Sequence, residues 1–243
     1  MKILIFGGTG EARELANNLV ALGHQVTTTL AGRTTNPVLP NGQVRHGGFG
    51  GARQLTEFIE QNGFDRVVDA THPYAQKMSN QVVLAMKPVS APLLRLIRAE
   101  WQKPDGAIWV NVPDANMAMQ QLPDICVPFL SLGHKEIGGI SNWPNNKCVV
   151  RLIEPPVAPL HQNVDLILAR PPYTLEDELA LMRMHKITHL LTKNSGGSQT
   201  RAKIDAAALL NIKTFVVARP TLAEAREVSS VDAAIALLQK DCS

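Results

Sequence analysis

The chain has 243 residues, which is more than one average domain needs and is enough for two small hydrophobic cores. Its 45% hydrophobic and 19% charged residues are ordinary for a globular protein and exclude extended disorder. The net charge of +3 argues against a general nucleic-acid-binding surface, but it leaves room for a local basic pocket for an acidic small molecule.

Cysteine spacing and hydropathy exclude further classes of protein. Cys126, Cys148 and Cys242 are widely spaced and form no C-x-x-C pair, so the sequence predicts neither a disulfide framework nor a zinc site. No apolar run approaches the length that spans a membrane, and the chain starts directly with a strand pattern rather than a signal peptide. We therefore expect a cytoplasmic protein without a metal site.

The N-terminal stretch predicts a strand, a glycine turn and a helix. Residues 2–6 are apolar β-formers, residues 7–10 read Gly-Gly-Thr-Gly, and helical spacing then continues to Gly23. Glycines let the backbone approach a ligand, and the first turn of the helix favours an anion, so a phosphate-bearing cofactor is the candidate ligand. Arg13 stands where the dinucleotide fingerprint has its third glycine, and a tight turn without a ligand remains the alternative.

The next strand indicates which dinucleotide is bound. Residues 25–31 form the predicted strand, and Arg33 and Thr34 follow it. An acidic residue near this point would bind the ribose 2′-hydroxyl of NAD, whereas an arginine accommodates the 2′-phosphate of NADP. No acid occurs between Gln25 and Asn41, so the sequence favours NADP(H); an exposed loop arginine is the alternative.

A second glycine-rich loop follows the third strand. Residues 44–46 predict a short strand, residues 47–51 read Gly-Gly-Phe-Gly-Gly, and residues 52–61 have helical spacing. Ligands of open parallel sheets bind at the carboxyl ends of strands, which favours ligand contact here over a mobile lid or a flexible turn.

The fourth strand, residues 66–70, carries His72 just beyond its end. We place Pro73 in the first turn of a helix that runs to about Met86. His72 is a candidate acid, base or hydrogen-bonding group, with a role in shaping the turn as the alternative. A fifth strand at 93–97 completes a βα series, which implies a parallel sheet and a first domain of residues 1–99.

The second half, residues 100–243, repeats the alternating design after a change of composition at 98–106. We expect strands at 108–112, 127–132, 148–153, 164–169 and 189–193, helices at 115–121 and 199–210, and a helix capped by Thr174. A strand at 215–217 fits either sheet, and Ser230 caps a last helix at 231–239.

A second strand, glycine turn and helix unit surrounds residues 194–197. Lys193, Arg201 and Lys203 lie around this turn, although cations at the start of a helix oppose its dipole. An anionic ligand explains the cluster. The alternative is a solvated face on which Asp205 balances the charges.

Blocks along nearly the whole chain resemble the precorrin-6A reductase family of cobalamin biosynthesis. They are Gly7-Gly-Thr9 with Glu11-Ala-Arg13, Ala31-Gly-Arg-Thr34, residues 47–51, residues 69–75, Ala169-Arg170, and residues 192–197 with Ala202-Lys203. The resemblance implies an α/β protein of two Rossmann-like domains with the active site in the cleft between them. It also implies NADPH-dependent reduction of one double bond of precorrin-6A, or of its cobalt-bearing form, to the precorrin-6B product.

The resemblance assigns roles to both domains. Residues 1–99 are expected to bind NADP(H) through Gly7, Gly8, Thr9, Gly10, Arg33, Thr34, Gly48, Phe49 and Thr71. Residues 100–243 are expected to bind most of the acidic tetrapyrrole, through Lys193, Ser195, Gly196, Arg201 and Lys203. Arg13 and Tyr74 of the first domain are expected to add substrate contacts. His72, Lys193 or water donates the proton, and no metal, nucleic acid or membrane is involved. Transient contacts with neighbouring pathway enzymes are also expected.

One residue and two rival functions do not fit this scheme. Glu11 would repel a pyrophosphate, so it is assigned to loop amides or a ribose hydroxyl. A short-chain dehydrogenase needs Tyr-x-x-x-Lys, and the sequence from Tyr74 to Lys77 is one residue short. A non-catalytic NADP-sensing protein with a partner-binding second domain is the alternative from another class.

Overall fold

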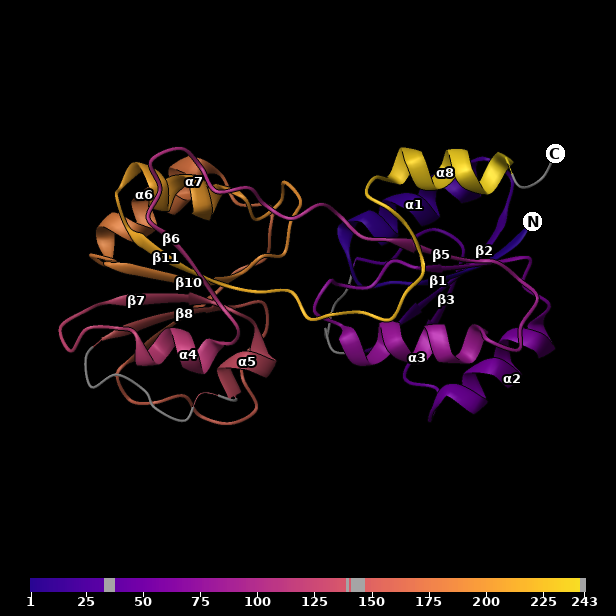
Figure 1. The fold of residues 1–243 in the computed structure, drawn as a ribbon, viewed down its shortest axis with the longest axis horizontal. Coiled ribbons are helices and arrows are strands. Elements are labelled where there is room, and N and C mark those ends of the chain that lie inside the picture. Colours follow the sequence, from indigo (N-terminus) through magenta and orange to yellow (C-terminus); the bar gives the residue numbers. More distant parts are fainter. Residues whose placement is uncertain (33–37, 139, 141–146, 241–243) are drawn as a thin grey trace. The chain divides into compact units, whose positions relative to one another are not determined.

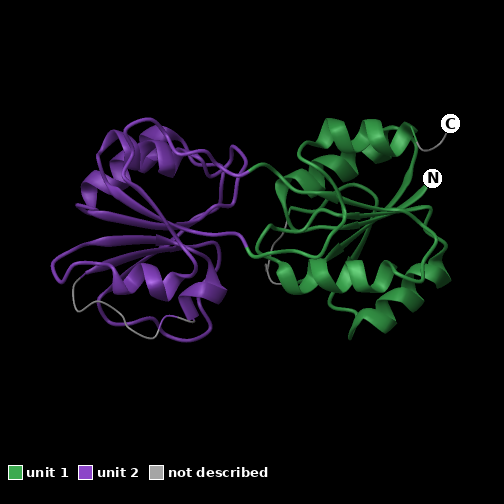
Figure 2. Ribbon diagram, viewed as in Figure 1, with its two compact units in different colours: residues 1–99, 220–243 green, residues 100–219 purple. Residues whose placement is uncertain are grey.

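The protein is described by a computed structural model that covers residues 1–32, 38–138, 140 and 147–240. It forms two compact units, the first made of Met1–Ala99 with Pro220–Ser243 and the second of Glu100–Arg219 (Figure 2). Each unit contains a six-stranded parallel sheet flanked by helices (Figure 1). The predicted α/β class with two parallel sheets is confirmed.

The first unit holds a sheet in the order β12-β5-β4-β1-β2-β3. Its strands are β1 (Lys2–Phe6), β2 (Gln25–Leu30), β3 (Gln43–His46), β4 (Arg66–Asp69), β5 (Leu93–Leu96) and β12 (Arg226–Val228). The strand order reverses between β1 and β4, and ligands of open α/β sheets bind at such a switch point.

Side-chain alternation along β1 divides the core of this unit into two layers. Ile3 and Ile5 pack with α1 (Gly10–Ala21) and α8 (Val231–Lys240), which lie side by side on one face (Figure 1). Leu4 and Phe6 face α2 (Ala52–Asn62) and α3 (Gln76–Met86) on the other face. This alternation is the strand period of two that the sequence predicts.

The C-terminal segment belongs to the first unit, so the expectation that residues 220–243 belong to the second domain is not met. β12 pairs in parallel with β5, and Val231, Ala234 and Leu238 of α8 enter the core beside α1. The three residues of β12 are largely polar and exposed, which is why hydrophobic periodicity did not reveal this edge strand.

The second unit has the strand order β6-β11-β10-β7-β8-β9, with its switch point between β7 and β10. The order is similar to that of the first unit except that the edge strand beside β11 is the first strand of its unit rather than the last. Its elements are β6 (Trp109–Val112), α4 (Ala115–Gln120), β7 (Pro128–Ser131), α5 (His134–Gly138), β8 (Cys148–Leu152), β9 (Val164–Leu168), α6 (Leu175–Met184), β10 (His189–Lys193), α7 (Ala202–Leu209) and β11 (Lys213–Val217). The strand that fitted either sheet, β11, lies between β6 and β10.

Two helices begin later than the sequence predicts. α3 begins at Gln76 because the His72 carbonyl accepts a hydrogen bond from Ala75 N at 2.7 Å, which places Pro73 in a separate turn. α7 begins at Ala202 rather than near residue 199 because Ser198 O accepts from Arg201 N, so a turn precedes the helix.

A buried ion pair lies inside the second unit. Arg151 on β8 donates to Glu178 on α6 at 2.7 Å, and the two side chains are 5% and 0% exposed. The Arg151 guanidinium also stacks over the Tyr173 ring at 3.7 Å. The pair joins strand and helix where neither charge reaches water.

Glu178→Gln is expected to lower the free energy of unfolding by about 3–5 kcal/mol, because it leaves the buried Arg151 charge uncompensated. Urea denaturation followed by circular dichroism measures the loss. Glu176→Gln removes the same charge from the exposed side of α6 and is expected to cost only about 0.3–1 kcal/mol. Equal losses from the two variants would contradict the assignment of Arg151 and Glu178 as a coupled pair.

Candidate functional site

The first glycine turn follows β1 at the switch point. The N–H of Gly7 donates to Thr29 O at 2.9 Å, and a Cβ on Gly7 would lie 2.8 Å from Thr28 Cγ2. Gly8 has a φ of 110°, a conformation that favours glycine. β2 therefore packs too closely for a side chain at Gly7, and the turn requires glycine at both positions.

Thr9 is the N-cap of α1, and its hydroxyl is committed to the protein. Thr9 Oγ1 accepts from Ala12 N at 3.0 Å and donates to Ala70 O at 2.9 Å, which ties the turn to the end of β4. Its single proton is thus unavailable to a phosphate oxygen. The donors that remain for an anion are the backbone N–H groups at the start of α1, such as that of Gly10.

Glu11, which is expected from the sequence to bind loop amides or a ribose hydroxyl, forms an ion pair with Arg98. Arg98 Nη1 lies 2.7 Å from Glu11 Oε2, and both side chains are partly buried. The pair neutralises the carboxylate beside the turn that is predicted to bind an anion. The sequence pattern indicates for Arg98 only the start of a connection, but its position just beyond the fifth strand is a signal that it lies at this edge of the sheet.

A small hollow opens at the carboxyl ends of β1, β4 and β5. Six residues line it: Thr9, Glu11, Thr71, Pro73, Leu96 and Arg98. The structure thus brings together two of the predicted cofactor residues, Thr9 and Thr71, and adds the pair of Glu11 with Arg98 to them.

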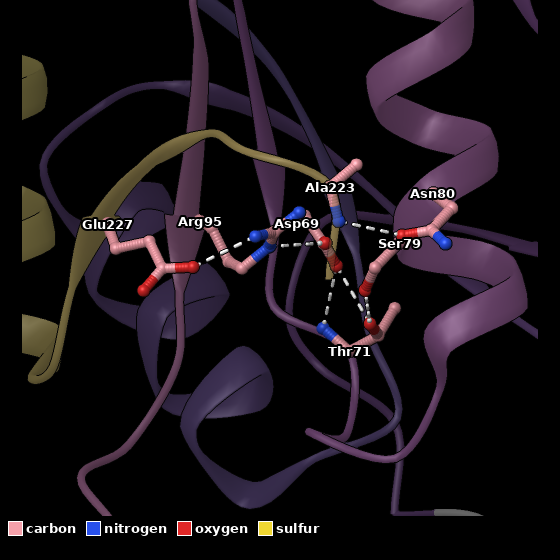
Figure 3. Close-up of polar contacts among 7 residues, drawn as sticks. All are labelled: Asp69, Thr71, Ser79, Asn80, Arg95, Ala223 and Glu227. Atoms are coloured by element: carbon pink, nitrogen blue, oxygen red, sulfur yellow. Dashed lines mark hydrogen bonds and ion pairs between the residues drawn. The ribbon is translucent and has the colours of Figure 1, made fainter. Parts of the chain in front are cut away.

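A polar network at the end of β4 fixes Thr71 (Figure 3). Asp69 Oδ1 accepts from Thr71 N at 3.2 Å and from Thr71 Oγ1 at 2.8 Å, while Asp69 Oδ2 accepts from Arg95 Nε at 3.1 Å. Ser79 Oγ lies 3.1 Å from Thr71 Oγ1. Arg95 Nη1 also donates to Glu227 at 2.8 Å, so β12 of the C-terminal segment closes the network.

His72 and Tyr74 lie together in the turn after β4. His72 Nδ1 accepts from Tyr74 N at 3.3 Å, and the two rings are 5.8 Å apart. These contacts favour the turn-shaping role of His72. Its role in proton transfer stays a prediction.

The loop at 47–51 is held by an arginine that the sequence analysis did not single out. Arg45 donates to Gly47 O and Gly48 O at 2.9 and 3.1 Å, and its guanidinium stacks over the Phe49 ring at 3.9 Å. Phe49 also contacts Phe6, with ring centroids 5.9 Å apart. The Phe49 ring therefore packs on the core, and only the backbone of this loop is a candidate ligand contact.

Lys193 ends β10 at the switch point of the second unit. Its Nζ lies 2.5 Å from Glu136 of α5, and the two side chains are 13% and 18% exposed. Burial lowers the pKa of Lys193, whereas the hydrogen bond and charge of Glu136 raise it and the charge of Lys135 lowers it further. A partly dehydrated ammonium is thus held at the predicted anion-binding edge.

Trp101 is fastened to the second glycine turn. Its backbone N–H donates to Asn194 Oδ1 at 2.8 Å, and its indole Nε1–H donates to Gly197 O at 2.7 Å. Gly196 and Gly197 have φ values of 70° and 74°, which favour glycine. Ser195 lies half-buried beside Asn194 in the same turn.

Two of the predicted substrate cations are occupied in building this turn. Lys203 is 3% exposed, donates to Thr200 O at 3.0 Å and lies over the Trp101 ring at 4.9 Å. Arg201 donates to Gln102 O and to Asp205, the latter at 2.9 Å. These contacts favour a structural use, and substrate binding by Arg201 and Lys203 stays a prediction.

The remaining predicted residues differ in how much is known of them. Arg13 is half-buried on α1 and makes no side-chain hydrogen bond or ion pair with the described residues. Arg33 and Thr34 lie outside the described residues.

Burial raises the pKa of Cys148 to about 12, so this thiol is an unreactive core residue.

Two searches of the described ranges concern metals and membranes. Within residues 1–32, 38–138, 140 and 147–240, no three His, Cys, Asp or Glu side chains are grouped as a metal site. In the same part of the chain, no helix combines the length and the apolar character needed to cross a membrane.

The model of a protein family described as precorrin-6x reductase CbiJ/CobK matches residues 2–239. The chain belongs to this family. It is 42% identical over 238 residues to the precorrin-6A reductase of Rhodococcus erythropolis, covering 97% of this chain and 96% of that protein. The corresponding figures for the Rhodobacter capsulatus precorrin-6A reductase are 35% over 223 residues, with 91% and 89% covered.

A solved structure of the family has the same fold. The CobK precorrin-6A reductase structure is 33% identical and superposes with a TM-score of 0.93, covering 98% of this chain and 96% of that one. Family members named for a cobalt-bearing substrate are more distant: the cobalt-precorrin-6A reductase of Priestia megaterium is 27% identical over 237 residues, with 90% and 91% covered.

The surroundings of Lys193 can be tested with two neighbouring substitutions of opposite sign. Glu136→Gln removes a charge that favours the ammonium, so the pKa of Lys193 is expected to fall further; Lys135→Gln removes a repulsion, so this pKa is expected to rise. NMR titration of the lysine side-chain signals measures both. Shifts of the same sign in the two variants would contradict the ion pair.

Proposed function

We propose that this protein catalyses the NADPH-dependent reduction of a ring double bond of precorrin-6A to precorrin-6B in cobalamin biosynthesis. The observation that carries the proposal is the match of nearly the whole chain, in sequence and in fold, to proteins named precorrin-6A reductase. A match that includes both units supports the complete reaction rather than cofactor binding alone.

The first unit is proposed to bind NADPH at the β1/β4 switch point. The backbone N–H groups after Gly8 and the dipole of α1 suit the diphosphate, because the Thr9 hydroxyl is already occupied. Arg33 is proposed to hold the 2′-phosphate, since no acid occurs between Gln25 and Asn41. When bound, NADPH supplies the hydride.

The second unit is proposed to bind the carboxylates of the tetrapyrrole. Acetate and propionate groups make this substrate strongly acidic, and a partly dehydrated ammonium such as that of Lys193 forms a stronger ion pair than an exposed one. Glu136 limits the loss of charge that burial imposes on Lys193. Arg13, which has no ion pair within the described residues, is proposed to hold a further carboxylate.

The reduction adds a hydride to one ring carbon and a proton to its neighbour. This chain must therefore orient the macrocycle, exclude water from the hydride and deliver one proton. His72, Lys193 and a bound water are the candidate donors. Lys193 is paired with Glu136, whereas His72 already uses Nδ1 within its turn, so Lys193 is the preferred candidate of the two side chains.

Cobalt-free precorrin-6A is the proposed substrate form. Relatives named for this form are 35–42% identical to the chain, whereas a relative named for the cobalt-bearing form is 27% identical. The proposed reaction needs no metal from the protein, since the cofactor carries the reducing electrons.

Incubation of the purified chain with precorrin-6A and NADPH is expected to bleach the long-wavelength absorption of the pigment. Cobalt-precorrin-6A and NADH serve as matched controls, and each is expected to give a rate at least about tenfold lower, which corresponds to 1.4 kcal/mol. No spectral change with either pigment would remove the enzyme assignment. NADPH binding without turnover would instead support the non-catalytic alternative.

Substitution of two arginines is expected to separate the two ligands. Arg13→Ala is expected to raise KM for the tetrapyrrole by about 10-fold or more with little change for NADPH, because a charge-assisted hydrogen bond is worth about 1.5–3 kcal/mol. Arg33→Ala is expected to do the reverse. Steady-state kinetics with each ligand varied in turn measures both KM values. If Arg13→Ala instead raises KM for NADPH and Arg33→Ala raises KM for the tetrapyrrole, the assigned roles are wrong.

A further inference from the structure

The hydroxyl of Thr71 has a proton whose direction the structure fixes. Thr71 Oγ1 has two polar neighbours, Asp69 Oδ1 at 2.8 Å and Ser79 Oγ at 3.1 Å. A carboxylate only accepts hydrogen bonds, and a hydroxyl has a single proton. The Thr71 proton therefore points to Asp69, and Ser79 must donate its own proton to Thr71.

The surroundings of Asp69 hold this arrangement in place. Asp69, Ser79 and Arg95 are 1%, 2% and 2% exposed as residues, and the Arg95 guanidinium pairs with Asp69 Oδ2 at 3.1 Å. Both oxygens of Asp69 thus serve as acceptors, Oδ1 for Thr71 N and Oδ2 for the Arg95 guanidinium. Glu227 bonds the other side of Arg95 at 2.8 Å (Figure 3).

The consequence is a group that accepts hydrogen bonds and does not donate them. One lone pair of Thr71 Oγ1 receives the Ser79 proton, which leaves the other lone pair for a ligand. Glu11 and Arg98 line the same hollow but are paired with each other, so the acceptor character rests on Thr71. The free lone pair of Thr71 Oγ1 suits a ligand group with a hydroxyl or amide proton rather than a phosphate oxygen.

The order of the strands indicates which half of the cofactor carries such a group. The predicted 2′-phosphate site at Arg33 follows β2, on one side of β1, and the diphosphate is proposed to lie at the turn after β1 itself. Thr71 follows β4, on the opposite side of β1. A dinucleotide that crosses the switch point therefore brings its nicotinamide ribose half to Thr71.

We propose that Asp69, held by Arg95, is a positioning residue that makes Thr71 an acceptor for a hydroxyl or amide proton of the nicotinamide ribose half of NADPH. This inference rests on the proposed function, because it takes NADPH as the ligand. It explains why a buried ion pair lies directly behind a candidate cofactor residue.

Calorimetry on the full chain with two ligands tests the role of Thr71. Thr71→Val is expected to weaken NADPH binding about 3- to 10-fold, the effect of one lost hydrogen bond. Adenosine 2′,5′-bisphosphate lacks the nicotinamide half, so its affinity is expected to change less than about 2-fold. Thr71→Ser restores the hydroxyl and is expected to recover NADPH binding. Equal weakening of both ligands, or of neither, overturns the inference.

A double-mutant cycle tests whether Asp69 acts through Thr71. Asp69→Asn frees the Thr71 proton from its fixed direction and is expected to weaken NADPH binding, with no further loss when Thr71→Val is added. Additive losses overturn the positioning role. Neutron diffraction of the unsubstituted chain decides the same point if Asp69→Asn does not fold: the proton must lie between Thr71 and Asp69, and a proton directed at Ser79 overturns the inference.

The controls separate this inference from the proposed function. If the unsubstituted chain binds neither ligand, the proposed cofactor is wrong and the inference fails with it. If the unsubstituted chain binds NADPH and reduces precorrin-6A while Thr71→Val binds NADPH normally, the inference alone fails. Glu57→Gln, which alters an exposed ion pair on α2, is the matched control and is expected to bind both ligands normally.

Discussion

The buried pair of Arg95 and Asp69 is the interaction on which the candidate cofactor edge depends. It joins the carboxyl ends of β4 and β5, fixes the direction of the Thr71 hydroxyl and, through Glu227, fastens the C-terminal edge strand. Removing two charges from water is unfavourable unless several hydrogen bonds compensate. Here a single carboxylate accepts three of them, and one guanidinium connects three strands.

The described residues show a division of labour between side chains and backbone at both switch points. The hydroxyl of Thr9 and the ammonium of Lys203 make internal hydrogen bonds that shape the glycine turns. In the first unit, this leaves backbone N–H groups as the candidate donors for the proposed phosphate, and such donors are fixed by the fold. In the second unit, Lys193 keeps a charged group at the edge because Glu136 opposes the effect of burial.

Local patterns made most of the fold predictable from the sequence. The apolar run of β1, the glycine at position 8 and the helical spacing of α1 are patterns among neighbouring residues. They predict the first strand, turn and helix correctly, and Gly8 has the positive φ that favours glycine. β12 is not predicted from the sequence, because an exposed edge strand of three residues has no apolar periodicity. The C-terminal segment was consequently assigned to the second domain.

The pairs within the candidate sites were not predictable in the same way. Glu11 and Arg98 are 87 residues apart, and Trp101 and Asn194 are 93 apart, so only the order of the strands brings them together. The sequence did reveal which strand ends carry polar residues, because glycine turns and the end of β4 are local signals. It did not reveal which of those polar groups form hydrogen bonds within the protein, as Thr9 and Arg201 do.

The discontinuous first unit has a consequence for synthesis on the ribosome. Its edge strand β12 and its covering helix α8 lie beyond residue 219, after the whole second unit. At about 5–20 residues per second, the residues of the second unit take on the order of ten seconds to translate. During that interval β12 does not yet pair with β5, and α8 does not yet cover the apolar face of α1. β5 is then an exposed sheet edge that can pair with strands of other chains. The unit that emerges first is therefore the last to be completed.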